Sequence, residues 1–210
     1  MKWRILLIDD HVAVQRGLED ILSASIAGAG FGRAGSSQQA LDQVRKELWD
    51  IAIVDLNLPG RSGLELIRSL KDEQPGLRVL VYSMHTEEQF GIRALRAGAD
   101  GYLMKSSPAE EIPKAVRSVL ETGQYIGPNL AAAMAQSILS GGINSTEALS
   151  DREYQVLKMI ASGKRPGDIA QELAVSIKTV STYRSRILEK LNLRSTAEMI
   201  RYAVDHRIVE

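Results

Sequence analysis

Three carboxylates, one hydroxyl and one ammonium group stand at the ends of short apolar segments of this chain. Asp9 and Asp10 follow the first segment, and Asp55, Ser83 and Lys105 come at the ends of three later ones. Carboxylates brought together repel one another, and their hard oxygen atoms are the ligands that Mg²⁺ prefers. Beside such a cation, a lysine and a hydroxyl could hold phosphoryl oxygens while a carboxylate attacks phosphorus to give an acyl phosphate. If the fold brings these five side chains together, we expect phosphoryl-transfer chemistry.

The elements that would have to position these groups are short strands that alternate with amphipathic helices. Apolar runs predict strands over 3–9, 50–56, 77–83 and 100–105. The segment 28–34 is rich in glycine, and its place in the alternation predicts a further strand there. Apolar residues at three- and four-residue spacings predict helices over 12–25, 36–48, 62–74, 86–98 and 108–123. This alternating order favours a flavodoxin-like α/β fold, a doubly wound parallel sheet of five strands. Reactive groups collect at the carboxyl ends of the strands in such sheets.

Each of these side chains also has an explanation without chemistry. Asp10 could cap a helix that begins near His11, because aspartate is a favoured N-cap residue. Asp55 could close a strand into the turn at 59–60, and Lys105 could be an ordinary surface charge. His11 is expected to be structural. These separate explanations do not account for five such groups falling at the same end of successive predicted strands.

Four motifs carry a resemblance to a known family. They are "LLIDDH" at 6–11, "VDLNLPG" at 54–60, "VYSMH" at 81–85 and "GYLMK" at 101–105. In this order and at these separations they resemble the receiver domain of two-component response regulators. The resemblance implies that residues 1–125 form a receiver domain and that Asp55 accepts phosphate from the phosphohistidine of a sensor histidine kinase.

The same resemblance implies a set of metal ligands. Asp10, Asp55 and the backbone carbonyl of Asn57 would bind Mg²⁺ directly, and Asp9 would act largely through water.

Three further residues acquire roles from the resemblance. Lys105 would pair with the phosphoryl oxygens, and Ser83 would take a hydrogen bond with the new phosphoryl group. Tyr102 would be the aromatic residue whose rotamer reports the state of the site, although a tyrosine at this position could also be an ordinary core residue.

Beyond Gly127 the pattern changes. "PNLAAAMAQSIL" at 128–139 predicts one more helix, which begins at a proline. The following "SGGINSTEA" is small and polar, as is typical of a linker. We therefore expect an extra helix and linker over residues 126–147 and a second domain over residues 148–210.

The second domain is predicted to consist of four helices. The first begins at a capping box formed by Ser150 and Glu153 and stops at Gly163. The other three are expected over 166–175, 176–193 and 195–209. A short helix, a tight turn and a longer helix make a helix-turn-helix, whose second helix can lie in the major groove of DNA.

The helix expected over 176–193 has two distinct faces. Val180, Ile187 and Leu191 would face the core, whereas small polar side chains occupy another face and basic ones flank it. Such cations suit contacts with phosphate. The residues predicted to contact DNA are Lys178, Thr179, Ser181, Thr182, Arg184, Ser185, Arg186 and Lys190. By periodicity alone, this face could equally be a solvated helix surface.

Residues 148 to about 207 are similar to the LuxR-type DNA-binding domain at the C-terminus of NarL/FixJ response regulators. Members often carry a basic residue where this chain has Ser181 and a histidine where it has Tyr183, and "RPGD" at 165–168 stands where Asn is common. These departures leave open which of Ser181, Thr182 and Ser185 contact bases.

Composition is that of an ordinary globular protein. The 210 residues are 44% hydrophobic and 25% charged, and the lack of cysteine excludes disulfides and thiolate metal sites. The first apolar run is too short for a signal peptide, and no stretch approaches the roughly 20 apolar residues that span a bilayer. We therefore expect a cytoplasmic protein without a membrane partner. Residues 148–210 hold 11 Lys/Arg and 8 Asp/Glu, a mild hint of a polyanionic partner.

Together the two domains predict a phosphorylation-controlled regulator of transcription. Phosphorylation of Asp55 would shift homodimerisation and binding to double-stranded DNA, and the receiver would catalyse only its own phosphoryl transfer and dephosphorylation. Two alternatives stay open. One is a phosphorylation-independent helix-turn-helix regulator that keeps the pocket as a relic. The other is a Mg²⁺-dependent aspartyl-phosphate phosphohydrolase, although such enzymes normally place the nucleophile near the first strand.

Overall fold

The computed structural model describes residues 3–58, 62–139, 149–206 and 208–209. The chain divides into two compact units, Met1–Ala135 and Gln136–Glu210, which we describe separately. The linker expected around 141–147 lies outside the described residues.

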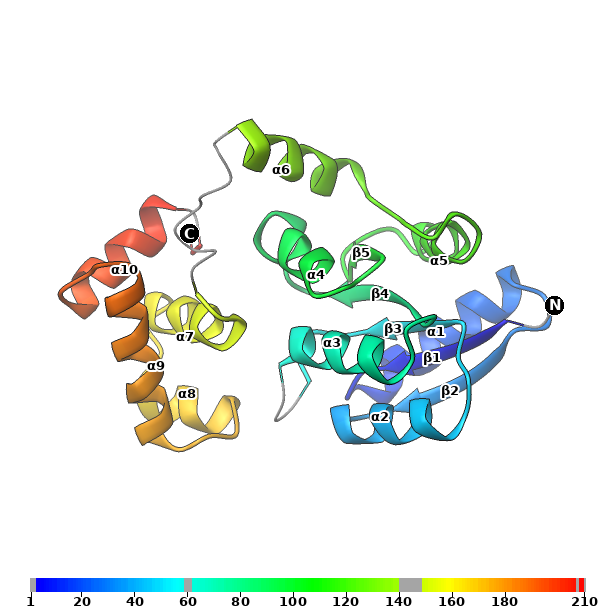
Figure 1. The fold of residues 1–210 in the computed structure, drawn as a ribbon, viewed down its shortest axis with the longest axis horizontal. Coiled ribbons are helices and arrows are strands. Elements are labelled where there is room, and N and C mark those ends of the chain that lie inside the picture. The colour runs from blue at the N-terminus through cyan, green and yellow to red at the C-terminus, as the bar shows by residue number, and fades with distance from the viewer. Residues whose placement is uncertain (1–2, 59–61, 140–148, 207, 210) are drawn as a thin grey trace. The chain divides into compact units, whose positions relative to one another are not determined.

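A parallel sheet of five strands forms the centre of the first unit (Figure 1). Its strands are β1 (Arg4–Ile8), β2 (Gly30–Ala34), β3 (Ile51–Val54), β4 (Arg78–Ser83) and β5 (Gly101–Met104). Their order in the sheet is β2-β1-β3-β4-β5. The position of β1 inside the sheet, between β2 and β3, is the doubly wound arrangement of flavodoxin-like folds. The predicted fold class of this unit is therefore confirmed.

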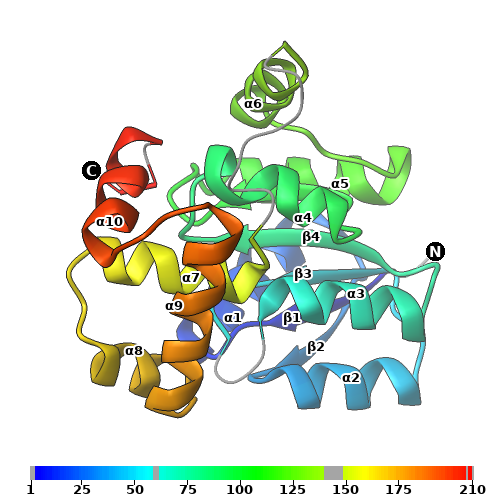
Figure 2. The same ribbon diagram turned by 60° about the vertical axis from the view of Figure 1, so that its left-hand side comes forward.

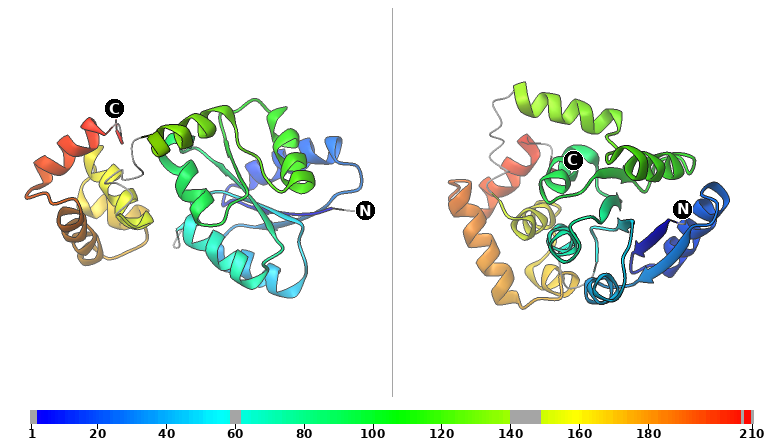
Figure 3. Two further views of the ribbon diagram at one scale, coloured as in Figure 1. Left: turned by 45° about the horizontal axis from the view of Figure 1, so that its top comes forward. Right: turned by 45° about the vertical axis from the view of Figure 1, so that its right-hand side comes forward.

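Helices cover both faces of this sheet (Figure 3). One layer contains α1 (Val12–Ser25) and α5 (Glu111–Thr122), which pack together. The other contains α2 (Ser37–Lys46), α3 (Gly63–Glu73) and α4 (Ile92–Arg96). Because both faces are covered, the central strand β3 is apolar along its whole length and each of its residues is buried.

The helix expected over 86–98 is not a single α-helix. Its first part is a π-helical turn, η1 (Glu87–Gly91), which continues directly into α4. Apolar spacing alone could not distinguish the two, because both place apolar residues on one side at similar intervals. A further helix, α6 (Pro128–Leu139), has the bounds that the sequence predicts.

One glycine of the strand β2 is required by the packing of a tryptophan. A Cβ atom at Gly32 would overlap the ring of Trp49, which is 5% exposed. At Gly30 the same addition would meet nothing within 4 Å. Gly32 is therefore required by close packing, whereas Gly30 is not.

The second unit consists of helices. They are α7 (Asp151–Ala161), α8 (Pro166–Glu172), α9 (Ile177–Lys190) and α10 (Thr196–Asp205). Figure 2 shows α9 lying across α7 and α8, the two helices it packs against. Ser150 and Glu153 form the predicted capping box at the start of α7. Apolar residues on α7 and α8 and directly beside them are buried: Leu149, Val156, Leu157, Ile160, Ile169, Ala170 and Leu173.

Among the described residues, none of the helices has both the length and the apolar character needed to cross a membrane.

Candidate functional site

Neighbouring strands bring two of the three carboxylates together. Ile8 pairs with Val54 in the register of β1 and β3, so that Asp9 and Asp55 each leave the same edge of the sheet. The backbone N–H of Asp55 donates to the carbonyl of Ile8 at 2.9 Å. Both carboxylates are buried, with Asp9 2% and Asp55 3% exposed. The parallel register therefore places two acidic groups in one buried pocket, as expected for the carboxyl ends of adjacent strands.

Lys105 links these carboxylates. Its Nζ lies 2.6 Å from Oδ2 of Asp9 and 2.7 Å from Oδ2 of Asp55. Burial disfavours the ammonium, but the hydrogen bonds and charges of Asp55 and Asp9 outweigh it and raise the pKa of Lys105 above its ordinary value. The pocket thus holds a lysine that stays charged and partly neutralises the acidic pair.

Asp10 is more open and lies beside His11. The Asp10 side chain is 34% exposed, and its Oδ1 lies 2.8 Å from Nδ1 of His11, which is also 3.1 Å from Oδ1 of Asp9. The N-cap residue of α1 is His11 rather than Asp10, and Asp9 accepts the His11 backbone N–H at 2.8 Å. Helix capping therefore does not account for Asp10. Asp9 bonds the backbone N–H of the N-cap residue, and the structure shows no side-chain cap for α1.

Asn57, in the loop after β3, contacts His85, in the loop after β4. Its side-chain Oδ1 lies 2.8 Å from Nε2 of His85, and its backbone N–H donates to Oδ1 of Asp55 at 3.1 Å. The His85 ring in turn stacks on Phe90, with centroids 4.3 Å apart. The loop after β3 is thus connected to the loop after β4 through an imidazole.

Ser83 and Tyr102 are completely buried. The Ser83 hydroxyl accepts the backbone N–H of His85 at 3.4 Å. The Tyr102 hydroxyl donates to the carbonyl of His85 at 2.9 Å, so its ring is held inside the unit. His85 therefore contacts the predicted switch residues through its backbone and Asn57 through its ring.

Helix α9 has the two faces that its sequence indicates. Val180 and Ile187 are buried, and Leu191, just beyond the helix, is half-buried. Of the eight residues predicted to contact DNA, Thr179 is half-buried and seven are exposed: Lys178, Ser181, Thr182, Arg184, Ser185, Arg186 and Lys190. The hydroxyls of Thr182 and Ser185 bond backbone carbonyls one turn earlier in the helix.

Two of the basic side chains on α9 bind within the unit. Nζ of Lys190 lies 2.7 Å from Oε2 of Glu153, the capping-box residue of α7. Burial opposes the charge of this carboxylate, but the hydrogen bonds from Lys190 and Ser150 lower the pKa of Glu153 below its ordinary value. Arg184 donates from Nε to the hydroxyl of Thr196 at 2.9 Å. Lys190 and Arg184 therefore help to hold α9 against α7 and α10.

Two family models match this chain. Residues 5–117 match the response regulator receiver domain, and residues 147–203 match the bacterial regulatory proteins of the luxR family. The chain is a response regulator of the NarL/FixJ family. It combines a receiver with a LuxR-type DNA-binding domain and is a phosphorylation-dependent regulator of transcription.

Relatives of this response regulator match along nearly its whole length. The transcriptional activator protein ExaE of Pseudomonas putida is 40% identical over 204 residues, which cover 96% of this chain and 95% of that protein. The response regulator GacA of Pseudomonas aeruginosa is 35% identical, covering 99% of this chain and 98% of its own. Among solved structures, RcsB of Salmonella enterica serovar Typhimurium, bound to the promoter rprA with the phosphomimetic BeF3⁻, is 25% identical with a TM-score of 0.66. That match covers 96% of this chain and 98% of RcsB.

The structure of this response regulator brings Asp9, Asp55 and Lys105 into direct contact. It places Asp10 next to Asp9 and His11, and Ser83 at the end of the neighbouring strand β4. It also adds two histidines to which sequence reasoning assigned no role. The sequence predicts a structural role for His11, and in the structure its ring contacts the carboxylates of both Asp9 and Asp10. His85 belongs to the quoted motif "VYSMH" but received no role, and its contacts with Asn57 and Phe90 join segments that are distant in sequence.

Proposed function

We propose that Asp55 is the phosphoacceptor of this response regulator and receives its phosphoryl group from the phosphohistidine of a sensor histidine kinase. The observation that carries this proposal is the 2.7 Å contact between Oδ2 of Asp55 and Nζ of Lys105 in a buried pocket. A carboxylate is a competent nucleophile toward phosphorus, and a neighbouring ammonium stabilises the charge that gathers on the transferred oxygens. Lys105 would hold one of these oxygens.

The pocket fits a divalent cation. Ligand atoms of Asp9, Asp10 and His11 lie within 4.8 Å of one another, and carboxylate oxygens are the donors that Mg²⁺ prefers. We propose Asp10, Asp55 and the backbone carbonyl of Asn57 as direct ligands, with Asp9 acting through water. The choice of Asp10 over Asp9 as a direct ligand is supported by its exposure, since the Asp10 side chain is 34% exposed and that of Asp9 is 3% exposed. When bound, Mg²⁺ would offset the negative charge of the carboxylates and of the phosphoryl group.

Ser83 and Tyr102 are proposed as the residues that respond to phosphorylation. Ser83 ends β4 at the same edge as Asp55, where its hydroxyl could donate to a phosphoryl oxygen. A hydrogen bond from Ser83 to a phosphoryl oxygen would act on His85, whose backbone bonds both Ser83 and Tyr102. Phosphorylation then biases a packed element between two arrangements, which we propose shifts homodimerisation.

We propose that α9 enters the major groove of double-stranded DNA. Support comes from its exposed polar face, formed by Lys178, Ser181, Thr182 and Ser185, with Thr179 at its start. Arg184, Arg186 and Lys190 would contact phosphates, which supply affinity without sequence information. A homodimer would bind two half-sites related by a two-fold axis. DNA binding in turn supports the expected location in the cytoplasm.

The first experiment tests the phosphoacceptor. The protein is incubated with Mg²⁺ and acetyl phosphate, and phosphoryl addition is followed by intact mass. Wild type and Asp20→Asn, a matched control on the exposed surface of α1, should gain one phosphoryl group, whereas Asp55→Asn should gain none. Equal labelling of Asp55→Asn and wild type would rule out this assignment.

A second measurement tests whether phosphorylation matters for DNA. Affinity for promoter DNA and oligomeric state are compared with and without beryllofluoride and Mg²⁺. Unchanged affinity and oligomeric state would favour a phosphorylation-independent regulator. Sustained phosphate release from added phosphoesters would favour a hydrolase instead of a protein that processes only its own phosphoryl group.

A further inference from the structure

Glu87 is a buried carboxylate that the proposed phosphoryl chemistry does not use. It is the first residue of η1 and is 5% exposed. Its Oε2 accepts a hydrogen bond from the backbone N–H of Leu130 at 2.8 Å. Leu130 is the third residue of α6, and the first N–H groups of a helix have no partner within the helix. Glu87 therefore caps α6 from a distant segment, and its negative charge also suits the positive end of the helix dipole.

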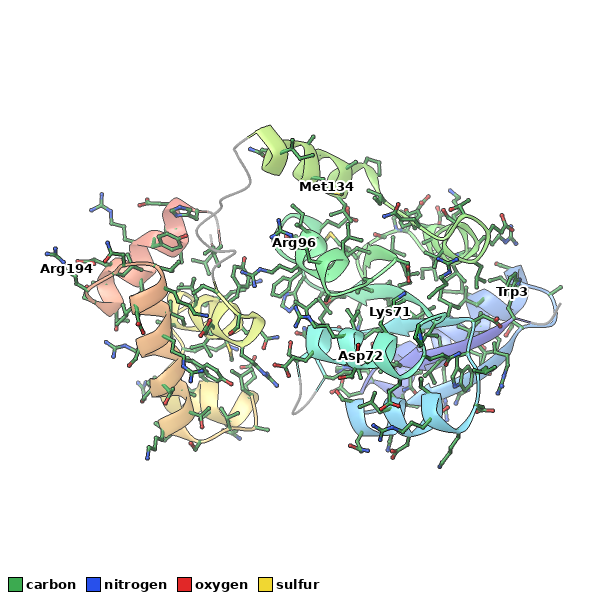
Figure 4. The ribbon with its side chains drawn as sticks, viewed as in Figure 1. Trp3, Lys71, Asp72, Arg96, Met134 and Arg194 are labelled. Atoms are coloured by element: carbon green, nitrogen blue, oxygen red, sulfur yellow. The ribbon has the colours of Figure 1, made fainter. Side chains whose placement is uncertain are left out.

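A second contact fixes the same turn. The Leu130 side chain is fully buried, and a Cβ atom at Gly91 would lie 2.5 Å from its Cδ1. The missing side chain of Gly91 thus makes room for Leu130. Among the side chains of α6 that the structure describes, Leu130 alone is buried, and Met134 one turn later is half-buried (Figure 4). The anchored part of α6 is therefore its first turn.

The chain reaches this turn along the edge of the sheet. Tyr125 forms a parallel bridge with Gly101 at the start of β5, and its backbone N–H donates to the carbonyl of Asp100 at 2.9 Å. These bonds hold the segment just before α6 against β5. Glu87 and Gly91 then receive the first turn of the helix.

η1 also contacts His85, which bonds the switch tyrosine. His85, two positions before Glu87, accepts the Tyr102 hydroxyl at 2.9 Å, and its ring stacks on Phe90. Phe90 is 1% exposed and directly precedes Gly91. The same short turn therefore touches the switch tyrosine through His85 and the first turn of α6 through Glu87 and Gly91.

We propose that Glu87, Gly91 and Leu130 form a clasp that couples the state of the phosphoacceptor pocket to α6. The coupling rests on the proposed function, because its input is phosphorylation of Asp55. A packed turn switches between discrete arrangements rather than deforming continuously, so a change at His85 and Tyr102 is passed to the clasp. The first turn of α6 thus becomes the place where the receiver transmits its state to the chain that follows it.

Hydrogen exchange of the full-length protein, followed by mass spectrometry, tests the clasp without any phosphodonor. In Glu87→Ala, amides in 129–135 should exchange roughly 2- to 30-fold faster than in wild type, the range expected for loss of a helix cap. Glu87→Gln keeps an acceptor oxygen and should show a smaller increase. Glu121→Gln, an exposed position on α5, is the matched control and should leave 129–135 unchanged. Wild-type exchange in this segment of Glu87→Ala, with a native circular dichroism spectrum, would overturn the clasp.

The coupling is tested by adding beryllofluoride and Mg²⁺. In wild type, this addition should change the amide exchange rates in 129–135 by about fivefold or more, which is the lower end of typical coupling between sites. In Glu87→Ala the same rates should not change. An equal response in both proteins, or no response in wild type while 83–91 responds, would overturn the coupling. If 83–91 does not respond and acetyl phosphate labels nothing, the proposed function and the coupling both fail. The clasp is then judged by the exchange measured without fluoride.

Discussion

Lys105 and Asp55, which are 50 positions apart in the chain, lie 2.7 Å from each other across the carboxyl edge of the sheet. The same ammonium lies 2.6 Å from Asp9, so one cation holds two buried carboxylates. Under the proposed function, this arrangement would supply a nucleophile, a charge to receive phosphoryl oxygens and an acidic group for a metal in one pocket. It also makes Lys105 important for stability.

Replacing Lys105 by methionine should destabilise the protein by about 3 kcal/mol, since it leaves buried carboxylates without their partner. Added Mg²⁺ should raise the melting temperature of Lys105→Met more than that of wild type, because the cation replaces the missing charge. Melting followed by circular dichroism with and without Mg²⁺ measures both effects. Lys114→Met, at a more exposed lysine of α5, is the control. Equal Mg²⁺ responses in Lys105→Met and wild type would contradict this explanation.

The stability difference between wild type and Lys105→Met should depend on pH in a way that follows from the raised pKa of Lys105. A lysine whose folded pKa exceeds its unfolded value of 10.5 contributes stability that is fully present below that value. The contribution is lost only as the pH rises through the higher folded value. The stability gap between wild type and Lys105→Met should therefore persist to the alkaline limit of the measurement.

Gly32→Ala should destabilise the receiver by about 1 to 3 kcal/mol, because its methyl group would overlap the Trp49 ring and force it to move. Gly30→Ala in the same strand is the control and should change stability far less, since nothing lies within 4 Å of that position. Urea unfolding provides the comparison. Adding Trp49→Phe should lessen the effect of Gly32→Ala. Equal losses for both alanine variants would show that strand propensity, rather than the tryptophan, requires Gly32.

Glu153→Gln should weaken the C-terminal unit by about 1 to 2 kcal/mol near neutral pH, because its carboxylate caps α7 and accepts a bond from Lys190. Its folded pKa lies below the ordinary 4.5, so this stabilisation is present above 4.5 and is lost as the pH falls through the folded value. The difference in stability between wild type and Glu153→Gln should therefore become smaller at acidic pH. Thermal melting over a pH series measures it, with Glu189→Gln on the exposed face of α9 as control. A gap that stays constant below pH 4 would refute the role of this charge.

Arg186→Ala should weaken binding to specific and non-specific DNA by similar factors and reduce the salt dependence of log K by about 0.9, as for loss of one phosphate contact. Fluorescence anisotropy over a salt series measures both quantities. Arg201→Ala on α10 removes an equal charge from an exposed position outside α9 and should have a smaller effect. An unchanged salt slope would remove Arg186 from the DNA-contacting set. Lys190→Ala should differ from Arg186→Ala by also lowering stability, because Lys190 binds Glu153.

Much of the fold could be predicted because it depends on local patterns. Buried parallel strands are apolar on both faces, which predicts most of the strands, and the regular alternation with helices predicts β2. The positions of all five agree with the sequence within two residues at each end. Once the strands are known to be parallel, Asp9, Asp55, Ser83 and Lys105 must meet at one edge. The capping box at Ser150 and the two faces of α9 are likewise local properties.

The sequence by itself determined the two-domain architecture, the pocket at the strand ends and the family. The tertiary structure decided which neighbours each side chain meets. It shows that Lys105 engages Asp9 while Asp10 lies beside His11, that Trp49 requires Gly32, and that Glu87 caps α6. Periodicity specifies the face on which a residue lies but not its partner from a distant segment. Such contacts depend on the packing of whole elements against one another.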